Sequence, residues 1–207
     1  MHDRMKLYET AIVIDEQPTR LESRREIERA MRAILRNVGE DPNREGLRKT
    51  PERVARMYEE LLAGYAVEPV ALINNATFEG DYDQMVVVRD IDFFSLCEHH
   101  LLPFFGQVHI AYLPQGKVLG LSKVPRVVEM FARRLQLQER MTQEIAEFID
   151  DLLRPDGVAV IVTGQHLCSM MRGVKKVNAK MTTQAFLGKF KESQFSEQFF
   201  RQIYQSD

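Results

Sequence analysis

The residues best suited to chemistry lie in two short segments, each at the end of an expected strand. The first contains Cys97 and His100, and the second contains Cys168. A Cys-x-x-His spacing where the chain turns can direct a thiolate and an imidazole at one metal ion, and the second cysteine supplies a further soft ligand if the two strand ends are neighbours. The spacing therefore predicts a zinc site formed by Cys97, His100 and Cys168, with one coordination position left for water.

Two histidines beside these ligands, His99 and His166, are candidates for proton transfer. The pKa of an unperturbed imidazole is about 6.5, so either residue can exchange a proton at physiological pH. Three other interpretations stay open at this point: a structural zinc with His99 as fourth ligand, two core thiols without metal, and a disulfide between the cysteines. The disulfide would leave the neighbouring histidines unexplained. His109, in the middle of an expected strand, is interpreted as an ordinary sheet residue.

A second group of candidates is cationic. Lys123 and Arg126 fall in the first turn of a helix that Ser122 is expected to cap, where free backbone N–H groups also favour anions. Arg172 follows the second cysteine by four residues, and Arg53 lies in the first turn of an earlier helix. Together these groups suit a polyphosphate, which arginine contacts with two parallel N–H donors. Each of them alone is more often a solvated surface charge.

Gln138 and Glu139 form a third candidate element, at the start of another expected helix. A carboxylate beside an amide can accept hydrogen bonds from the ring N–H and the exocyclic amine of guanine and donate one to its carbonyl. The competing interpretation is that a glutamate near a helix N-terminus is favoured by the helix dipole alone.

Length and composition narrow the class of protein. The chain has 207 residues, 44% hydrophobic and 28% charged, which suits one globular domain with or without a helical extension. The net charge is −2 and no long basic run occurs, so binding to a nucleic-acid backbone is not expected. No apolar run reaches the roughly 20 residues of a membrane span, and the N-terminus lacks the apolar core of a signal peptide. We therefore expect a cytoplasmic protein whose thiols stay reduced.

Periodicity divides the chain into a mobile N-terminal arm over residues 1–18, a helical region over 19–73 and a catalytic domain over 74–207. Apolar residues at helical spacing predict the helices, and β-branched and aromatic residues predict the strands. The expected helices cover 19–38, 50–63, 122–134, 138–153 and the tail from 192, and the expected strands cover 85–94, 104–113, 118–122, 157–171 and 181–190. This order of helices and strand pairs indicates an α+β fold with an antiparallel sheet.

Three longer segments contain most of these candidates: SLCEHHLLPFFGQVHIAYLP, GLSKVPRVVEMFARRLQLQERMTQEIA and HLCSMMRGVKK. They resemble the signature blocks of the GTP cyclohydrolase I family, and DPNREGLRKTPERVARMYEELLAGY resembles the helical region that precedes them. The similarity runs from about Thr19 to the C-terminus. Departures from the usual family pattern at Pro125 and at residues 183–185 touch no proposed chemical role.

The resemblance implies the tunnelling fold, in which antiparallel sheets of several subunits join into a β-barrel with helices outside. It implies a homodecamer of two stacked pentamers with active sites at subunit interfaces. The implied reaction is the zinc-dependent hydrolysis of GTP to 7,8-dihydroneopterin triphosphate and formate, the first step of tetrahydrofolate and pterin biosynthesis.

The resemblance also assigns roles to residues by motif match. The implied zinc ligands are Cys97, His100 and Cys168. The implied catalytic residues are His99, His166 and Ser122. The implied substrate contacts are Gln138 and Glu139 for guanine, Lys123, Arg126 and Arg172 for ribose and triphosphate, and Arg53 from a neighbouring subunit.

Two alternative functions fit part of the pattern. A tunnelling-fold nitrile reductase with a nicotinamide cofactor would use Cys97 as a nucleophile, but it would give Cys168 beside His166 no role. A non-catalytic nucleotide-binding module with a structural zinc would bind nucleotide without turnover.

Overall fold

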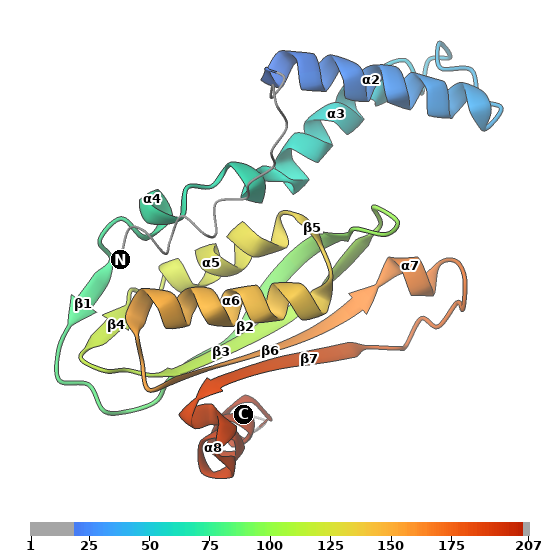
Figure 1. The fold of residues 1–207 in the computed structure, drawn as a ribbon. Helices are drawn as coiled ribbons and strands as arrows, with labels where there is room; N and C mark the ends of the chain where they lie inside the picture. Colours follow the sequence, from blue (N-terminus) through green and yellow to red (C-terminus); the bar gives the residue numbers. More distant parts are fainter. Residues whose placement is uncertain (1–18, 205–207) are drawn as a thin grey trace. The chain divides into compact units, whose positions relative to one another are not determined.

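The computed structural model describes residues 19–204, so the arm expected over residues 1–18 lies outside the described residues. The described part of the chain forms two compact units, residues 19–63 and residues 64–204. The first unit contains a pair of helices, and the second contains a sheet with its covering helices (Figure 1). Among the predicted site residues only Arg53 belongs to the helical unit.

The helical unit is formed by α2 (Arg20–Asn37) and α3 (Thr50–Leu61). A capping box starts α2: the Thr19 hydroxyl accepts from the N–H of Glu22 at 3.3 Å, and the Glu22 carboxylate accepts from the N–H of Thr19 at 2.8 Å. Glu59 of α3 accepts from Arg24 at 2.6 Å and from Arg20 at 2.9 Å. These hydrogen bonds hold the pKa of Glu59 at about 2 and link the two helices.

The larger unit contains a five-stranded sheet in the order β5-β2-β3-β6-β7. Its strands are β2 (Val86–Cys97), β3 (Pro103–Leu113), β5 (Leu135–Gln136), β6 (Gly157–His166) and β7 (Met181–Gly188). The pairs β2–β3, β3–β6 and β6–β7 are antiparallel, and β5 adds a short parallel pairing at the end of β2. The predicted α+β architecture with an antiparallel sheet is confirmed.

A separate two-stranded sheet joins β1 (Thr77–Glu79) to β4 (Lys117–Leu119), a pairing that the sequence did not predict. The short helix η2 (Ala63–Ala66) begins at the last residue of the helical unit. The helices of the larger unit are α4 (Pro69–Ile73), α5 (Lys123–Ala132), α6 (Gln138–Leu153), α7 (Leu167–Met170), η3 (Lys189–Lys191) and α8 (Ser193–Tyr204). Within residues 19–204, no helix combines the length and the apolar character that crossing a membrane requires.

Helices cover both faces of the main sheet, but unequally. α5 and α6 lie along one face (Figure 1), where Phe131 and Phe148 join Phe93 and Phe104 of the sheet in the main core. Each of these phenylalanines is at most 1% exposed, and burying one contributes about 2 kcal/mol. α8 covers part of the opposite face, where Phe199 packs with alanines and an isoleucine of β3 and β6. Elsewhere on that face, within residues 19–204, Phe94 is 54% exposed.

The expected strand over 157–171 ends earlier than predicted. Residues 157–162 are all buried, as their continuous apolar run suggests, but β6 stops at His166 and the chain enters α7. On one side β6 pairs with β3 only as far as Phe104, and on the other side β7 begins at Met181, opposite Gly164. Beyond His166 neither neighbouring strand offers backbone partners, so the chain satisfies its own N–H and C=O groups in a helical turn.

Candidate active site

Topology brings the three predicted ligands to one edge of the sheet. β3 lies between β2 and β6 and runs antiparallel to both, so those two strands end at the same edge. Cys97 is the last residue of β2, His100 lies in the turn that follows, and Cys168 lies in α7 directly after β6. Their ligand atoms all lie within 4.8 Å of one another. This group can hold a metal ion.

The turn after β2 gives His100 its position. Cys97 donates its N–H to the carbonyl of Leu102 at 2.9 Å, and its own carbonyl accepts from Leu101 at 2.8 Å and from His100 at 3.3 Å. Leu101 has a φ of 53°, a left-handed conformation that is uncommon for a side chain of this size. The backbone therefore carries local strain at the point where it presents His100, which is typical of functional turns.

The chemistry of the donor set fits a borderline-soft divalent ion such as Zn²⁺. Cys97 is 6% exposed, Cys168 is half-buried and His100 is exposed, so the group is sheltered on one side and open on the other. Burial, and then the adjacent Cys97, raise the pKa of the Cys168 thiol. Two thiolates with an imidazole are a common zinc donor set.

The two non-ligand histidines lie beside the ligand group. His99 is exposed, with Nδ1 3.9 Å from the Cys97 sulfur. His166 stacks on Phe104, with ring centroids 4.6 Å apart and an angle of 4° between the planes. Nε2 of His166 lies 2.9 Å from Oε1 of Gln138. Burial lowers the pKa of His166, and the nearby Glu139 carboxylate opposes that shift.

The two members of the Gln138-Glu139 pair face different surroundings. Gln138 is 1% exposed, and its amide group bonds within the protein. Glu139 is exposed in the first turn of α6. Of the pair, Glu139 alone presents its side chain to solvent.

The predicted cationic residues are only partly brought together. Arg172 reaches the ligand group, since Nη1 lies 3.2 Å from Nε2 of His100. The ammonium of Lys123 donates to the Leu72 carbonyl at 2.7 Å. Ser122 is the residue before α5, as predicted, but its side chain makes no capping hydrogen bond. Arg126 is exposed; within residues 19–204, no hydrogen bond or ion pair connects it, Ser122 or Lys123 to the ligand group.

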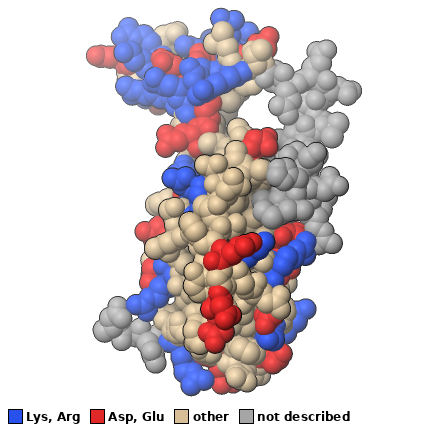
Figure 2. Space-filling view, turned by 90° about the vertical axis from the view of Figure 1, so that its left-hand side faces the viewer, with Lys and Arg blue, Asp and Glu red and all other residues tan. Residues whose placement is uncertain are grey.

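Charges of both signs are mixed over the surface. In the view of Figure 2, Lys and Arg are dense on the helical unit, with Asp and Glu among them. On the larger unit, residues of both signs are scattered. On the described residues of the larger unit, this view shows no continuous basic stripe of the kind that tracks a nucleic-acid backbone.

Comparison with known proteins gives the family. A family model described as GTP cyclohydrolase I matches residues 27–204. The chain belongs to the GTP cyclohydrolase I family. The resemblance carried by the three sequence segments is thereby confirmed.

Curated members of the GTP cyclohydrolase I family are similar over most of this chain. A GTP cyclohydrolase 1 of Chlorobium chlorochromatii is 54% identical over 179 residues, which are 86% of this chain and 80% of the relative. One of Porphyromonas gingivalis is 54% identical over 170 residues, which are 82% of this chain and 88% of that relative. A GTP cyclohydrolase 1 1 of Pseudomonas aeruginosa is 53% identical, with 83% and 92% covered. The likeness therefore includes both units and all three signature segments.

An ion-pair network that the sequence did not predict supports the turn after β2 in this GTP cyclohydrolase I family member. Arg140 of α6 pairs with Glu98, the residue between Cys97 and His99, and donates to the Leu135 carbonyl at 3.0 Å. Arg140 also donates to Oε1 of Gln136 at 3.1 Å, and the Gln136 carbonyl accepts from the N–H of Glu98 at 3.1 Å. No spacing rule connects residues 42 positions apart, so the sequence offered only their opposite charges as a signal.

Arg140→Met is expected to loosen this turn and to weaken metal retention by roughly tenfold or more, the size of effect seen when groups that orient metal ligands are removed. The measurement is the rate at which a chelator strips the metal from the folded protein. Arg133→Met is the matched control, because it removes an arginine that pairs with Glu129, away from the turn. Equal stripping rates for the two variants would contradict the role of Arg140.

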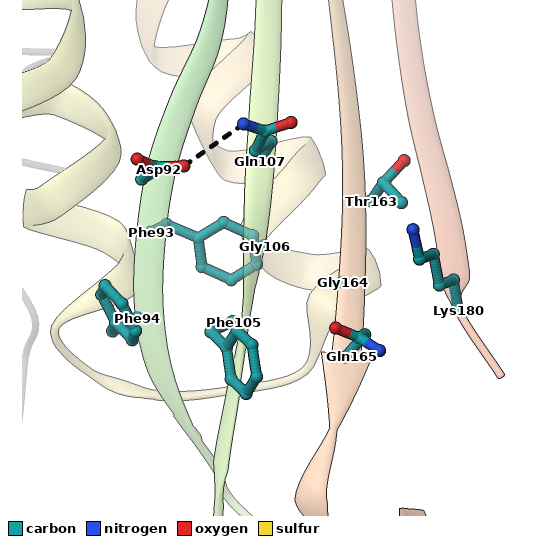
Figure 3. A pocket seen from close by; sticks show the side chains of 10 residues that line it. All are labelled: Asp92, Phe93, Phe94, Phe105, Gly106, Gln107, Thr163, Gly164, Gln165 and Lys180. Carbon is teal, nitrogen blue, oxygen red and sulfur yellow. Dashed lines mark hydrogen bonds between the residues drawn. The ribbon is translucent and has the colours of Figure 1, made fainter. Parts of the chain in front are cut away.

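A hollow of about 260 Å³ lies on the open face of the sheet (Figure 3). Phe94 and Phe105 stack there with centroids 5.9 Å apart, and Gln107 donates to Asp92 at 3.3 Å. Side chains alternate along β2, so Phe94 points to this face while its neighbour Phe93 points into the main core. The hollow contains none of the predicted site residues.

Proposed function

We propose that this chain hydrolyses GTP to 7,8-dihydroneopterin triphosphate and formate, with a zinc ion held by Cys97, His100 and Cys168. The observation that carries the proposal is the convergence of these three ligand atoms within 4.8 Å, with His166, two residues before Cys168, bonded to Gln138 at the start of α6. Membership of the GTP cyclohydrolase I family supports the choice of substrate.

Zinc in this site would lower the pKa of a coordinated water and so provide a nucleophile near neutral pH. The protein's part is to hold the purine so that C8 of its imidazole ring faces that water. Three protein ligands, rather than four, keep one coordination position available for this purpose.

His166 is the proposed proton carrier at the purine ring nitrogen, with His99 as the second. Burial holds the pKa of His166 below its usual value, which favours the neutral ring that can accept a proton and pass it on. The stacked Phe104 keeps the ring in one plane. Ser122 is proposed as a proton carrier in the later opening and rearrangement of the ribose, which precedes closure to the pterin.

Charged side chains would orient the two ends of GTP. Glu139, exposed at the start of α6, can accept hydrogen bonds from the ring N–H and the exocyclic amine of guanine. Arg172, Lys123 and Arg126 supply cations for the ribose and the triphosphate. Arg53 is proposed to reach the triphosphate of a neighbouring subunit's site. Fixing both ends of the nucleotide sets the position of the imidazole ring between them.

The proposed assembly is the tunnelling fold of the family, a cytoplasmic homodecamer of two stacked pentamers whose sheets join into a barrel. Within residues 19–204 the edge strand β7 pairs only with β6, and β5 covers only the last two residues of β2. Strand edges of this length favour pairing with another copy of the chain. A reducing compartment suits two free cysteines that are to hold a metal.

The alternative functions account for fewer of these features. A nitrile reductase that uses Cys97 as nucleophile needs no second thiol within ligand distance. A non-catalytic module with structural zinc needs neither the sheltered His166 nor an open coordination position.

Zinc content and formate release from GTP, measured before and after chelation, test the proposal. We expect close to one zinc per chain, loss of formate release on chelation and recovery when zinc is added back. Bound zinc without formate under any of these conditions would favour the binding module, and the absence of both would reject the proposed reaction.

A further inference from the structure

The side chain of Gln138 is buried at the start of α6 and has all its polar atoms engaged. Its amide nitrogen lies 3.1 Å from the Val162 carbonyl oxygen, 3.0 Å from that of Met181 and 3.1 Å from the Thr183 hydroxyl. Carbonyl oxygens can only accept, so the nitrogen end of the amide must face them. The oxygen end, Oε1, therefore faces Nε2 of His166 at 2.9 Å.

The threonine hydroxyls agree with this orientation. Thr142 donates to the Gln138 backbone carbonyl at 2.7 Å, so its oxygen accepts from Thr183, 2.6 Å away. Thr183 has then used its one proton and accepts from the Gln138 amide. Every donor in this hydrogen-bonded series has a defined direction, and among residues 19–204 the group that faces Oε1 of Gln138 is Nε2 of His166, which must donate its proton.

We propose that Gln138 is a positioning residue that holds the neutral His166 ring in the tautomer with its proton on Nε2. An amide oxygen can only accept, so Nε2 must carry the proton, and the lone pair is left on Nδ1. Nδ1 is thus the atom through which His166 meets the substrate. The inference deepens the proposed function. The catalytic use of His166 rests on that function, whereas the tautomer of His166 does not depend on turnover.

Two neighbours keep the pair in this geometry. Phe104 stacks on the His166 ring and resists its rotation. Gly164 leaves the space that the Gln138 side chain occupies, because a Cβ at this position would lie 2.5 Å from Oε1 of Gln138. The φ of Gly164 is not in the left-handed region, so its backbone conformation does not require glycine. This glycine instead provides space for the Gln138 side chain over the sheet.

The proposal gives Gln138 a different task from Glu139, although the two are adjacent in sequence. At 1% exposure and with four partners in the protein, the Gln138 side chain is not exposed to a purine outside. Guanine recognition through this pair is then carried by the carboxylate of Glu139, and Gln138 acts on the reaction only through His166.

The first test uses the wild-type, zinc-loaded protein with ¹⁵N-labelled histidine, at about pH 8, where an imidazole of ordinary pKa is neutral. Nitrogen chemical shifts and couplings report which ring nitrogen carries the proton, and a His166→Asn sample assigns the signals. We expect His166 to be protonated at Nε2. A proton on Nδ1 instead would overturn the proposal, whether or not the protein releases formate from GTP.

The second test compares Gln138→Met with the matched control Gln143→Met, which replaces an exposed glutamine of the same helix. Gln138→Met should give a mixture of His166 tautomers and a kcat lower by roughly tenfold or more, with KM for GTP and zinc content within about twofold of wild type. Gly164→Ala, which displaces Oε1 from a different direction, should shift the tautomer in the same way.

A direct guanine contact would behave differently. Gln138→Met would then raise KM and reduce the preference for GTP over ATP while the His166 tautomer stayed unchanged, and that result would overturn the proposal. If Gln138→Met does not fold, the wild-type spectrum and Gly164→Ala still decide the question.

Discussion

Cys168→Ser is expected to lose the bound metal and to lower GTP turnover by at least about a thousandfold, because in the proposed reaction the activation of the reacting water depends on the ion. Cys168 supplies one of the three ligand atoms that lie within 4.8 Å of one another. A serine hydroxyl stays protonated near neutral pH and cannot replace a thiolate on zinc. The measurements are zinc per chain by mass spectrometry and formate release from GTP.

The control for this variant is Met171→Ser, which introduces the same hydroxyl at an exposed position just after α7. It should keep both zinc and turnover. The melting temperature of Cys168→Ser should equal that of chelated wild type, which separates loss of metal from misfolding. Wild-type turnover by metal-free Cys168→Ser would remove the metal from the mechanism altogether.

Glu139→Gln is expected to reduce the preference for GTP over ATP by roughly 10- to 100-fold. A hydrogen bond to a charged group contributes about 1.5–3 kcal/mol, and 1.4 kcal/mol corresponds to a factor of ten. The amide keeps one acceptor oxygen but lacks the charge, and its NH₂ group opposes the donors on the Watson–Crick edge of guanine. The measurement is the dissociation constant of GTP and of ATP, together with that of free triphosphate.

Glu147→Gln is the matched substitution on the same helix, since Glu147 is exposed and bonds only to Gln143 among the hydrogen bonds of residues 19–204. It should leave nucleotide preference unchanged. Affinity for free triphosphate should change little in either variant, because Glu139 is proposed to contact only the base. An unchanged preference in Glu139→Gln would reject its role in guanine recognition.

The sequence by itself determined the kinds of element and the chemistry available at their ends. Alternation and β-branched residues predicted the strands that became β2, β3 and β7, and 3.6-residue periodicity predicted α5 and α6. The spacing of Cys97 and His100 determined that one turn would present a thiolate and an imidazole together. These features depend on residues within a few positions of one another, so local rules suffice to predict them.

Only the tertiary structure decided which distant segments meet. Cys168 approaches Cys97 because β3 lies between β2 and β6 and makes them end at one edge, and no local pattern encodes that strand order. The pairing of Arg140 with Glu98 and the early end of β6 have the same origin. Each depends on the register of neighbouring strands.

For the adjacent residues Gln138 and Glu139, too, the sequence did not determine the surroundings of each side chain. From sequence they form one polar pair at the start of a helix, equally suited to a purine. In the structure α6 lies on the sheet, so a rotation of about 100° between successive helical residues buries one against β6 and β7 and leaves the other exposed. Residue type determined what each side chain can bond to, and packing decided which of the two bonds within the protein and which is exposed to solvent.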